Sequence, residues 1–504
     1  MKQSLFYRFL GMLLALSSLL FVACDDDDDN ESPIVKPDII FYGLTATNEI
    51  IEYNANASGT PISTMSITGL QSGETLLAID FRPATGQLYG VGSTSRLYSI
   101  HLASGAATAI GTGPFSPAID GNTIGFDFNP TVDRIRIVTN NGQNLRLNPE
   151  TGVVAATDMP LNPGSPGING VAYANSVAGA ASTTLFDIDM ASQKLFKQDP
   201  PNDGTLVEVG GLGITPTAEG GFDISPDNEV ALAALTVNNA NGLYQIDTNT
   251  GKATGLGMLS EAIIGLAIPT NPVAYSVDNA NNLLIFNFMT SESPVSKPIT
   301  GLQASETILG IDMRPLTGQL YALGSSSRIY AINMSSGVAA AVGTSPFDVP
   351  LEGTAFGFDF NPTVDRIRIV SDLGQNLRAH PVTGAVAFVD MDLNPGTPAV
   401  SAAAYNTNMA GATATTLFDI DPATDKLYRQ VPPNDGKLEE VGALGINVEA
   451  NNGFDIGGQS NIAYGIFTVG STTKIYSINL ANGVATAMSD APASAKGLAI
   501  GLGF

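Results

Sequence analysis

Two sets of three aspartates stand at equivalent places in short apolar segments of the two halves of the chain. They are Asp80, Asp127 and Asp223 in the first half and Asp312, Asp359 and Asp455 in the second. If these segments are strands that line a channel, the carboxylates have the chemistry of a glycoside hydrolase or lyase. In the first half each aspartate stands three residues before a proline, so its oxygens could instead accept backbone N–H groups in a turn. Repetition of one residue type favours this structural alternative, because catalysis needs different groups in different places.

A group of arginines follows the second aspartate of each set. The candidate ligand-binding residues are Asp133, Arg134, Arg136, Asn144 and Arg146, with the copies Asp365, Arg366, Arg368, Asn376 and Arg378. Residues two apart on a strand share a face, so Arg134 and Arg136 are expected on one side. Guanidinium groups bind carboxylate or sulfate through paired hydrogen bonds, which makes this group a candidate ligand site. The alternative is an internal lattice of ion pairs through Asp127 or Asp133.

Alternating acids at two strand ends are weak candidates for a calcium site. The first half has Asp187 and Asp189, and the second has Asp419, Asp421 and Asp425, where Gln193 is the first-half counterpart of Asp425. Carboxylates are the ligands that calcium prefers, but the glycine and glutamate of an EF-hand loop are missing. Solvated loop acids are the alternative. The sequence contains no nucleophile elbow, phosphate-binding loop, dinucleotide fingerprint or Cys-x-x-Cys pair, so we expect no cofactor other than calcium.

The elements that position these residues belong to a duplicated unit. The stretch GFDFNPTVDRIRIV occurs unchanged at Gly125–Val138 and Gly357–Val370, 232 residues apart. Within each half, short segments of alternating apolar and polar residues are separated by Gly, Pro, Asn and Asp, which is typical of antiparallel strands. A smaller period of about 46 residues, with four such strands, predicts the blades of a β-propeller.

One blade in each half is split between the two ends of that half. FYGLTATNEIIEYN and TPISTMSI supply three of its strands at the start, and Ile263–Ile268 supplies the innermost strand at the end. The second half repeats this arrangement with AYSVDNANNLLIFN and Lys496–Ile500. We therefore predict an all-β fold of tandem five-bladed β-propellers with antiparallel four-stranded blades, over residues 38–270 and 271–504. Because GLAIPTNPVAYSV also fits a hairpin, a single ten-bladed propeller is the alternative.

The N-terminal segment has the pattern of an export signal. Residues 1–23 combine basic Lys2 and Arg8 with an apolar run that is too short to span a bilayer, which predicts a signal peptide. The end of this run resembles a bacterial lipoprotein box, which implies lipidation at Cys24, the only cysteine of the chain. Asp25–Asp29 resemble the acidic signal that sends lipoproteins to the cell surface. We expect residues 24–37 to form a lipidated acidic tether in the outer membrane, with the periplasmic face as the alternative location.

Charge excludes some partners. The net charge of −25 repels nucleic acid and anionic membrane surfaces, so neither is expected as a partner apart from the lipid anchor. Charged residues make up 14% and apolar residues 44% of the chain, which indicates a packed globular protein.

Phrases that recur in both halves resemble a known family. DFRPATGQLY and DMRPLTGQLY, GFDFNPTVDRIRIV, GQNLR, TTLFDID and PPNDG are similar to the bacterial family catalogued as domain of unknown function 4394. The resemblance covers nearly all of residues 40–504 and implies an exported, repetitive β domain without an assigned activity. We therefore expect a surface-anchored lipoprotein that binds or scaffolds a glycan, peptide or matrix ligand. The alternatives are an extracellular glycoside hydrolase or lyase that uses the channel carboxylates, and a purely structural envelope protein.

Overall fold

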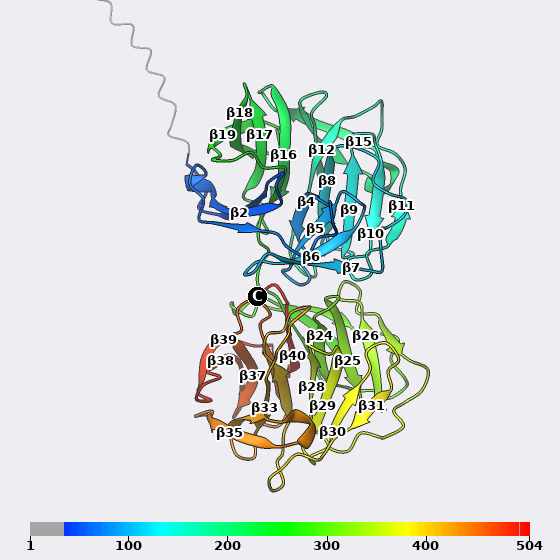
Figure 1. Ribbon diagram of the computed structural model, residues 1–504, viewed down its shortest axis with the longest axis vertical. Helices are drawn as coiled ribbons and strands as arrows, with labels where there is room; N and C mark the ends of the chain where they lie inside the picture. The colour runs from blue at the N-terminus through cyan, green and yellow to red at the C-terminus, as the bar shows by residue number, and fades with distance from the viewer. Residues whose placement is uncertain (1–34, 493) are drawn as a thin grey trace, which may run out of the picture. The chain divides into compact units, whose positions relative to one another are not determined.

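The fold is built from short antiparallel strands. A computed structural model describes residues 35–492 and 494–504 of the chain. Within these residues the strands form ten antiparallel sheets of four strands each, connected by turns and three short 3-10 helices (Figure 1). The predicted all-β class with four-stranded antiparallel blades is confirmed. The predicted signal peptide, Cys24 and Asp25–Asp29 lie outside the described residues.

The first repeat contributes five sheets, with strand orders β20-β1-β2-β3, β4-β5-β6-β7, β11-β10-β9-β8, β12-β13-β14-β15 and β16-β17-β18-β19. Their strands are β1 (Ile40–Leu44), β2 (Glu49–Asn54), β3 (Ser63–Ser66), β4 (Leu76–Phe81), β5 (Leu88–Gly92), β6 (Leu97–His101), β7 (Ala106–Ile110), β8 (Ile124–Asn129), β9 (Arg134–Thr139), β10 (Asn144–Leu147), β11 (Val154–Thr157), β12 (Ile168–Tyr173), β13 (Leu185–Asp189), β14 (Lys194–Gln198), β15 (Leu206–Gly211), β16 (Pro216–Ile224), β17 (Ala231–Val237), β18 (Ala240–Ile246), β19 (Ala253–Met258) and β20 (Gly265–Ala267).

The second repeat contributes five more, with strand orders β23-β22-β21-β40, β24-β25-β26-β27, β28-β29-β30-β31, β32-β33-β34-β35 and β36-β37-β38-β39. Their strands are β21 (Ala274–Val277), β22 (Asn282–Phe286), β23 (Val295–Pro298), β24 (Ile308–Arg314), β25 (Gln319–Gly324), β26 (Arg328–Ile332), β27 (Ala339–Val342), β28 (Phe356–Asn361), β29 (Arg366–Ser371), β30 (Asn376–Ala379), β31 (Val386–Val389), β32 (Ala402–Tyr405), β33 (Leu417–Asp421), β34 (Lys426–Gln430), β35 (Leu438–Ala443), β36 (Gly453–Ile456), β37 (Ala463–Val469), β38 (Thr472–Ile478), β39 (Ala485–Asp490) and β40 (Lys496–Ile500).

One sheet in each repeat joins strands from its two ends. β20 pairs with β1, so that Tyr42 lies opposite Ala267, and β40 pairs with β21, so that Ala274 lies opposite Ile500. These are the split sheets that the sequence predicts. The hairpin that GLAIPTNPVAYSV allows between β20 and β21 does not form, because each of these strands pairs with a strand of its own repeat.

Neighbouring sheets meet along one strand of each, which we call the inner strand. In the first repeat β4 contacts β8, β8 contacts β12, β12 contacts β16, β16 contacts β20, and β20 contacts β4. In the second repeat β24, β28, β32, β36 and β40 contact one another in the same order. The approach is close: a Cβ atom added at Gly357 on β28 would lie 2.7 Å from the backbone nitrogen of Ala403 on β32. Glycine at this place is therefore a packing requirement of neighbouring inner strands.

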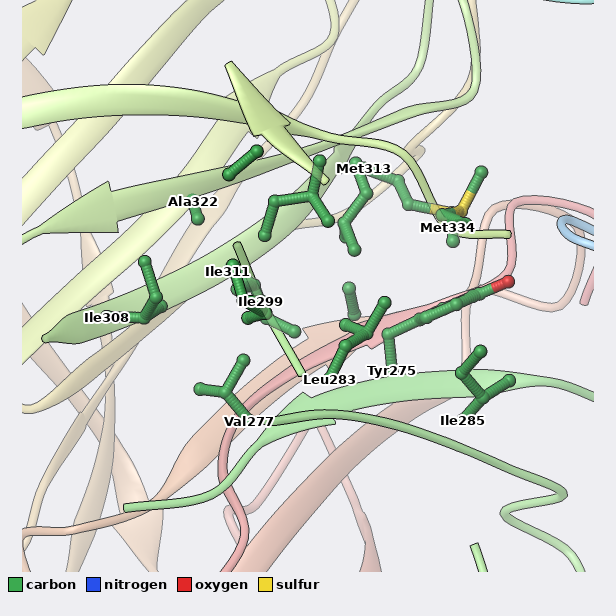
Figure 2. Packing of buried hydrophobic residues seen from close by; sticks show 14 of the residues in the cluster. Tyr275, Val277, Leu283, Ile285, Ile299, Ile308, Ile311, Met313, Ala322 and Met334 are labelled. Carbon is green, nitrogen blue, oxygen red and sulfur yellow. The ribbon is translucent and has the colours of Figure 1, made fainter. Parts of the chain in front are cut away.

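Alternating side chains divide between the spaces on the two sides of each sheet. On β9, Ile135 and Ile137 point into an apolar cluster with Phe126 and Phe128, while Arg136 points to the opposite face. Figure 2 shows another apolar cluster, in the second repeat, where Tyr275 and Val277 of the split sheet pack with Ile311 and Met313 of β24. Because both faces of most strands are covered, a polar side chain inside the fold must find its hydrogen-bond partners there.

No helix in the described part of the chain is both long and apolar enough to cross a membrane.

Candidate functional site

Six aspartates lie on inner strands in two groups of three, each of which we call a carboxylate cluster. Asp80 on β4, Asp127 on β8 and Asp223 on β16 form the first, and Asp312 on β24, Asp359 on β28 and Asp455 on β36 form the second. In each cluster one carboxylate oxygen from every member lies within 4.8 Å of the others. The six residues are between 1% and 4% exposed. The structure thus brings together the acids that the sequence singles out, and it buries them.

The cluster carboxylates join neighbouring inner strands through backbone hydrogen bonds. Phe128 N on β8 donates to Asp80 Oδ2 at 3.0 Å, and Phe360 N on β28 donates to Asp312 Oδ2 at 2.7 Å. In the same way, Tyr405 N on β32 donates to Asp359 Oδ1 at 2.9 Å. These donors belong to the adjacent sheet. Asp80, Asp223 and Asp455 also accept the N–H of the next residue of their own strand, so the backbone support that the structural alternative predicts is present as well. Each aspartate is therefore a link between sheets.

The environment disfavours the charged form of these acids. Burial raises the pKa of Asp80 and Asp127 well above the usual value, and the neighbouring carboxylates raise it further. Burial raises the pKa of Asp223 and of Asp455 to about 7, against the opposing effect of two backbone N–H bonds in each case. Among residues 35–492 and 494–504, no lysine or arginine forms an ion pair with any cluster carboxylate.

Some buried carboxylate oxygens, on cluster residues and on β13 and β33, have no hydrogen-bond partner. These atoms are Oδ1 of Asp127, Oδ1 of Asp312 and both oxygens of Asp187 and Asp419. Asp187 on β13 and Asp419 on β33 are fully buried. Burial raises the pKa of Asp187 well above the usual value and that of Asp419 to about 8, and Arg136 and Arg368, respectively, oppose the shift. Asp419 in turn raises the pKa of Asp359, so it lies near the second cluster.

All three guanidinium nitrogens of Arg136 have hydrogen-bond partners inside the first repeat. Its guanidinium donates to Asn144 Oδ1 at 2.6 Å and Asp158 Oδ2 at 2.7 Å. It also donates to Asn202 Oδ1 at 2.9 Å and to the Tyr173 hydroxyl at 3.3 Å. Arg368 repeats this set with Asn376, Asp390, Asn434 and Tyr405. The contacts match the predicted alternative of an internal ion-pair lattice. Arg136 and Arg368 pair with Asp158 and Asp390, whereas Asp133, which the alternative names, pairs with Arg82 next to β4 of the neighbouring sheet.

The other predicted ligand-binding residues extend or flank this lattice. Arg146 forms a two-point ion pair with Asp158, at 2.7 and 2.8 Å, and Arg378 does the same with Asp390. Although burial opposes it, hydrogen bonds from Arg146 and Arg136 hold the pKa of Asp158 below its usual value. The remaining residues are engaged elsewhere: Asp133 pairs with Arg82, Asp365 pairs with Arg314, and Arg134 and Arg366 donate to backbone carbonyls.

The predicted calcium candidates of the two TTLFDID segments do not converge. Asp421 accepts N–H bonds from Ala423 and Ala399, and Asp425 accepts one from Val448. Asp189 is held in the same way by Gly167 and Ala191. In the described part of the chain, the two carboxylate clusters are the only groups of three or more such side chains spaced to hold a metal ion.

Sequence reasoning missed a polar cavity where the inner strands of the second repeat begin. The cavity has a volume of about 200 Å³, and its polar lining is Thr354, Ser401, Asn451, Asn452 and Lys496. The next residues along these strands, which include Gly357, Ala403 and Leu498, line a narrower space of about 10 Å³ before the cluster is reached.

Lys496 gives this cavity its charge. Burial lowers the pKa of its amine, and Asp278 partly offsets the shift. Asn452 Nδ2 donates to Ser401 Oγ at 2.8 Å and so fixes one side of the cavity. The first repeat has Ile264 and Gly220 at the places of Lys496 and Asn452. This difference between otherwise similar halves is the signal by which the sequence could have indicated the cavity.

Comparison with known proteins identifies the repeat. A family model described as a domain of unknown function (DUF4394) matches residues 49–267 and again residues 282–500, which confirms the predicted pair of tandem copies. No curated protein matches the chain.

Solved structures with low overall similarity also match. The extracellular domain of a one-component system of B. thetaiotaomicron is 14% identical, with a TM-score of 0.26, over 90% of this chain and 59% of that one. PorZ, described as an essential surface component of the type-IX secretion system of Porphyromonas gingivalis, is 12% identical, with a TM-score of 0.25, over 90% and 59%. The dihydro-heme d1 dehydrogenase NirN is 11% identical, with a TM-score of 0.25, over 81% and 74%. The chain thus spans less than two thirds of the first two structures.

Proposed function

Because this chain belongs to the family of the domain of unknown function DUF4394, in two tandem copies, we propose from its geometry that it is a binding protein. Each copy forms a five-bladed β-propeller, and the second copy holds a ligand at the mouth of its channel. The ligand carries a carboxylate, as an acidic glycan or the end of a peptide does. The arginine lattice and the carboxylate clusters maintain the fold.

Strand pairing supports two rings over one. The terminal strands of each repeat share a sheet, and the five inner strands of each repeat contact one another in a cycle. The narrow space above the second cluster is lined by residues of all five inner strands of that repeat. A ten-bladed ring would need β20 and β21 to lie in one sheet, whereas they lie in different sheets.

The observation that carries the proposal is the cavity around Lys496. Its lining offers amide, hydroxyl and amine groups at one end of the inner strands, which suits a ligand with a charged head and several hydroxyl groups. A volume of about 200 Å³ is small, so we expect it to hold one terminal group of a longer ligand. The partly buried amine supplies a charge-assisted hydrogen bond to a carboxylate.

The burial of the clusters favours binding over catalysis. Glycoside hydrolases hold two carboxyl groups on either side of the scissile glycosidic bond, so the sugar must reach both groups. The cluster oxygens lie within 4.8 Å of one another, behind a space of about 10 Å³ in the second repeat. A space of this volume cannot admit a sugar ring, and the six aspartates are almost completely buried.

The location that we propose is the cell surface. The lipoprotein box at Cys24 and the acidic run Asp25–Asp29 support an outer-membrane anchor with the two propellers outside. A short tether over residues 24–37 would leave the cavity free to meet polymers near the cell.

The repeat offers a matched test of ligand binding. Arrays of neutral glycans, acidic glycans and peptides are probed with the full chain, with Lys496→Ile and with Ile264→Lys. We expect acidic ligands to bind the full chain and Ile264→Lys, and to bind Lys496→Ile at least tenfold more weakly, while both variants unfold at the wild-type temperature. Equal binding by all three proteins, or no binding by any, would reject this site.

A further inference from the structure

We propose that each carboxylate cluster binds one calcium ion, so that the chain carries two structural calcium ions at the inner strands. The ligands in the first repeat are Asp80, Asp127 and Asp223, and those in the second are Asp312, Asp359 and Asp455. These ions are separate from the ligand site around Lys496, and the inference does not depend on that site.

The spacing of the oxygens fits calcium. Three oxygens that all lie within 4.8 Å of one another can share one ion at metal–oxygen distances of about 2.3–2.6 Å. Magnesium needs a regular octahedron at about 2.0–2.1 Å, which is a tighter and less adaptable arrangement. The three acids come from three different sheets in each repeat, so an ion between them would tie those sheets together.

Unpartnered oxygens indicate that the clusters are incomplete. Asp127 Oδ1 and Asp312 Oδ1 are buried, belong to cluster residues and have no hydrogen-bond partner. A buried polar atom without a partner is costly, and native proteins rarely keep one. Each repeat thus has one unpartnered cluster oxygen, but at different places: Asp127 lies on β8, and Asp312 lies on β24, where its counterpart Asp80 Oδ1 accepts the N–H of Phe81. An ion at the centre of the cluster would satisfy both atoms.

The other contacts of the clusters suit carboxylates that are charged. Asp223 accepts backbone N–H bonds of 2.6 Å from Ile224 and Ile268, and Asp455 accepts bonds of 2.6 Å from Ile456 and Ile500. N–H donors stabilise the charged form of an acid. Three charged acids at this spacing need a counter-charge, yet no basic side chain of the described residues is paired with them. A divalent cation supplies that charge.

The experiment measures metal content after refolding. The full chain is unfolded in guanidinium chloride with EGTA, then refolded in buffers that contain calcium, magnesium or neither, and bound metal is counted by elemental mass spectrometry. The variants are Asp127→Asn, Asp359→Asn and the pair together, which keep the shape of the side chain and an acceptor for the backbone N–H. Asp247→Asn is the matched control, because Asp247 accepts N–H bonds in an exposed turn away from both clusters.

We expect two calcium ions per wild-type chain and per Asp247→Asn chain, one in each single variant and none in the double variant. Calcium, and not magnesium, should also raise the thermal unfolding midpoint of the wild-type protein, a measurement that needs no variant. Folded wild-type protein that retains no calcium would overturn the inference and would mean that the clusters share protons. Two ions retained in the double variant would overturn it as well, since the ions would then bind elsewhere.

Discussion

The backbone N–H of Ile500 donates a hydrogen bond of 2.6 Å to Oδ2 of Asp455. Ile500 ends β40, the last strand of the chain, and Asp455 lies on β36 of the neighbouring sheet. The first repeat has the same relationship between Ile268 and Asp223, also at 2.6 Å. A side chain thus connects two sheets that no strand ladder joins, at the place where each repeat ends.

Removal of this acceptor should destabilise the protein. Asp455→Ala leaves the N–H of Ile500 without a partner, whereas Asp455→Asn removes the charge but keeps an oxygen. Because a buried N–H without a partner costs about 1–3 kcal/mol, we expect the alanine variant to have a free energy of unfolding lower than that of the asparagine variant by this amount. Urea denaturation measures the difference. The same pair of substitutions at the exposed Asp247 should differ less, and equal stability of the two Asp455 variants would contradict the link.

The stability of the calcium-free protein should depend on pH. The pKa of Asp223 and of Asp455 is about 7 in the folded protein, against 3.8 for an unperturbed aspartate. Protons therefore bind the folded state more tightly, and in EGTA the free energy of unfolding should fall as pH rises from about 4 to about 7. The limiting slope is about 1.4 kcal/mol per pH unit for each group. The pKa of Asp158 is lowered, so its ion pairs stabilise the folded protein above about pH 4. Below that pH the carboxylate takes up a proton, and this contribution to the free energy of unfolding is lost.

Urea unfolding at several pH values checks this dependence. With calcium present, the free energy of unfolding should depend less on pH, because a bound cation removes the preference of the folded state for protons. A free energy of unfolding that rises between pH 4 and 7 in EGTA would contradict the raised pKa values of Asp223 and Asp455.

The arginine lattice should contribute to stability and not to ligand binding. Arg136→Leu leaves buried Asp158 with one cation and leaves Asn144 and Asn202 without a donor, so we expect a loss of about 3–5 kcal/mol in the free energy of unfolding. Arg368→Leu should have the same effect in the second repeat. Arg134→Ala, at a half-buried residue whose contact is a backbone carbonyl, should change stability by less than about 0.5 kcal/mol. Loss of ligand binding in Arg134→Ala at unchanged stability would instead favour a ligand site at these arginines.

Attachment to the membrane should depend on Cys24. We expect the wild-type protein in the membrane fraction and Cys24→Ser in the soluble fraction, because the acyl chains provide the hold. Replacement of Asp25–Asp29 by alanine should leave the protein in the membrane fraction but protect it from protease added to intact cells. Protease sensitivity equal to wild type would mean that the acidic run does not direct the protein to the surface.

Much of the fold follows from local pattern. Arg134 and Arg136 alternate with Ile135 and Ile137, which predicts the strand β9. Because successive side chains of a strand point to opposite faces, the pattern also predicts that the arginines and the isoleucines lie on different faces of the sheet. The duplication predicts that β1 and β20 belong to one sheet, since each half lacks one strand unless its ends meet. Closure of each repeat into a ring remains a prediction.

The candidate site was less accessible to sequence reasoning because its contacts are distant along the chain. The convergence of Asp80, Asp127 and Asp223 was indicated by their equivalent places in the repeat. Their donors, such as Phe128 for Asp80, belong to the next sheet, and sequence spacing says nothing about which amides of that sheet point inward. The partner of Arg136 is likewise Asp158, at the edge of β11, where the sequence shows only one acid in a loop.

The position of β1 within its sheet has a mechanical consequence. β1 is bonded on both sides, to β20 through Tyr42, Gly43 and Leu44 and to β2 along its whole length. If the protein is anchored at Cys24, a force applied to a captured polymer pulls on this strand first. Extraction of β1 requires that two ladders break together, whereas an edge strand would peel from one. The strand nearest to the predicted attachment point is therefore one that is held on both sides.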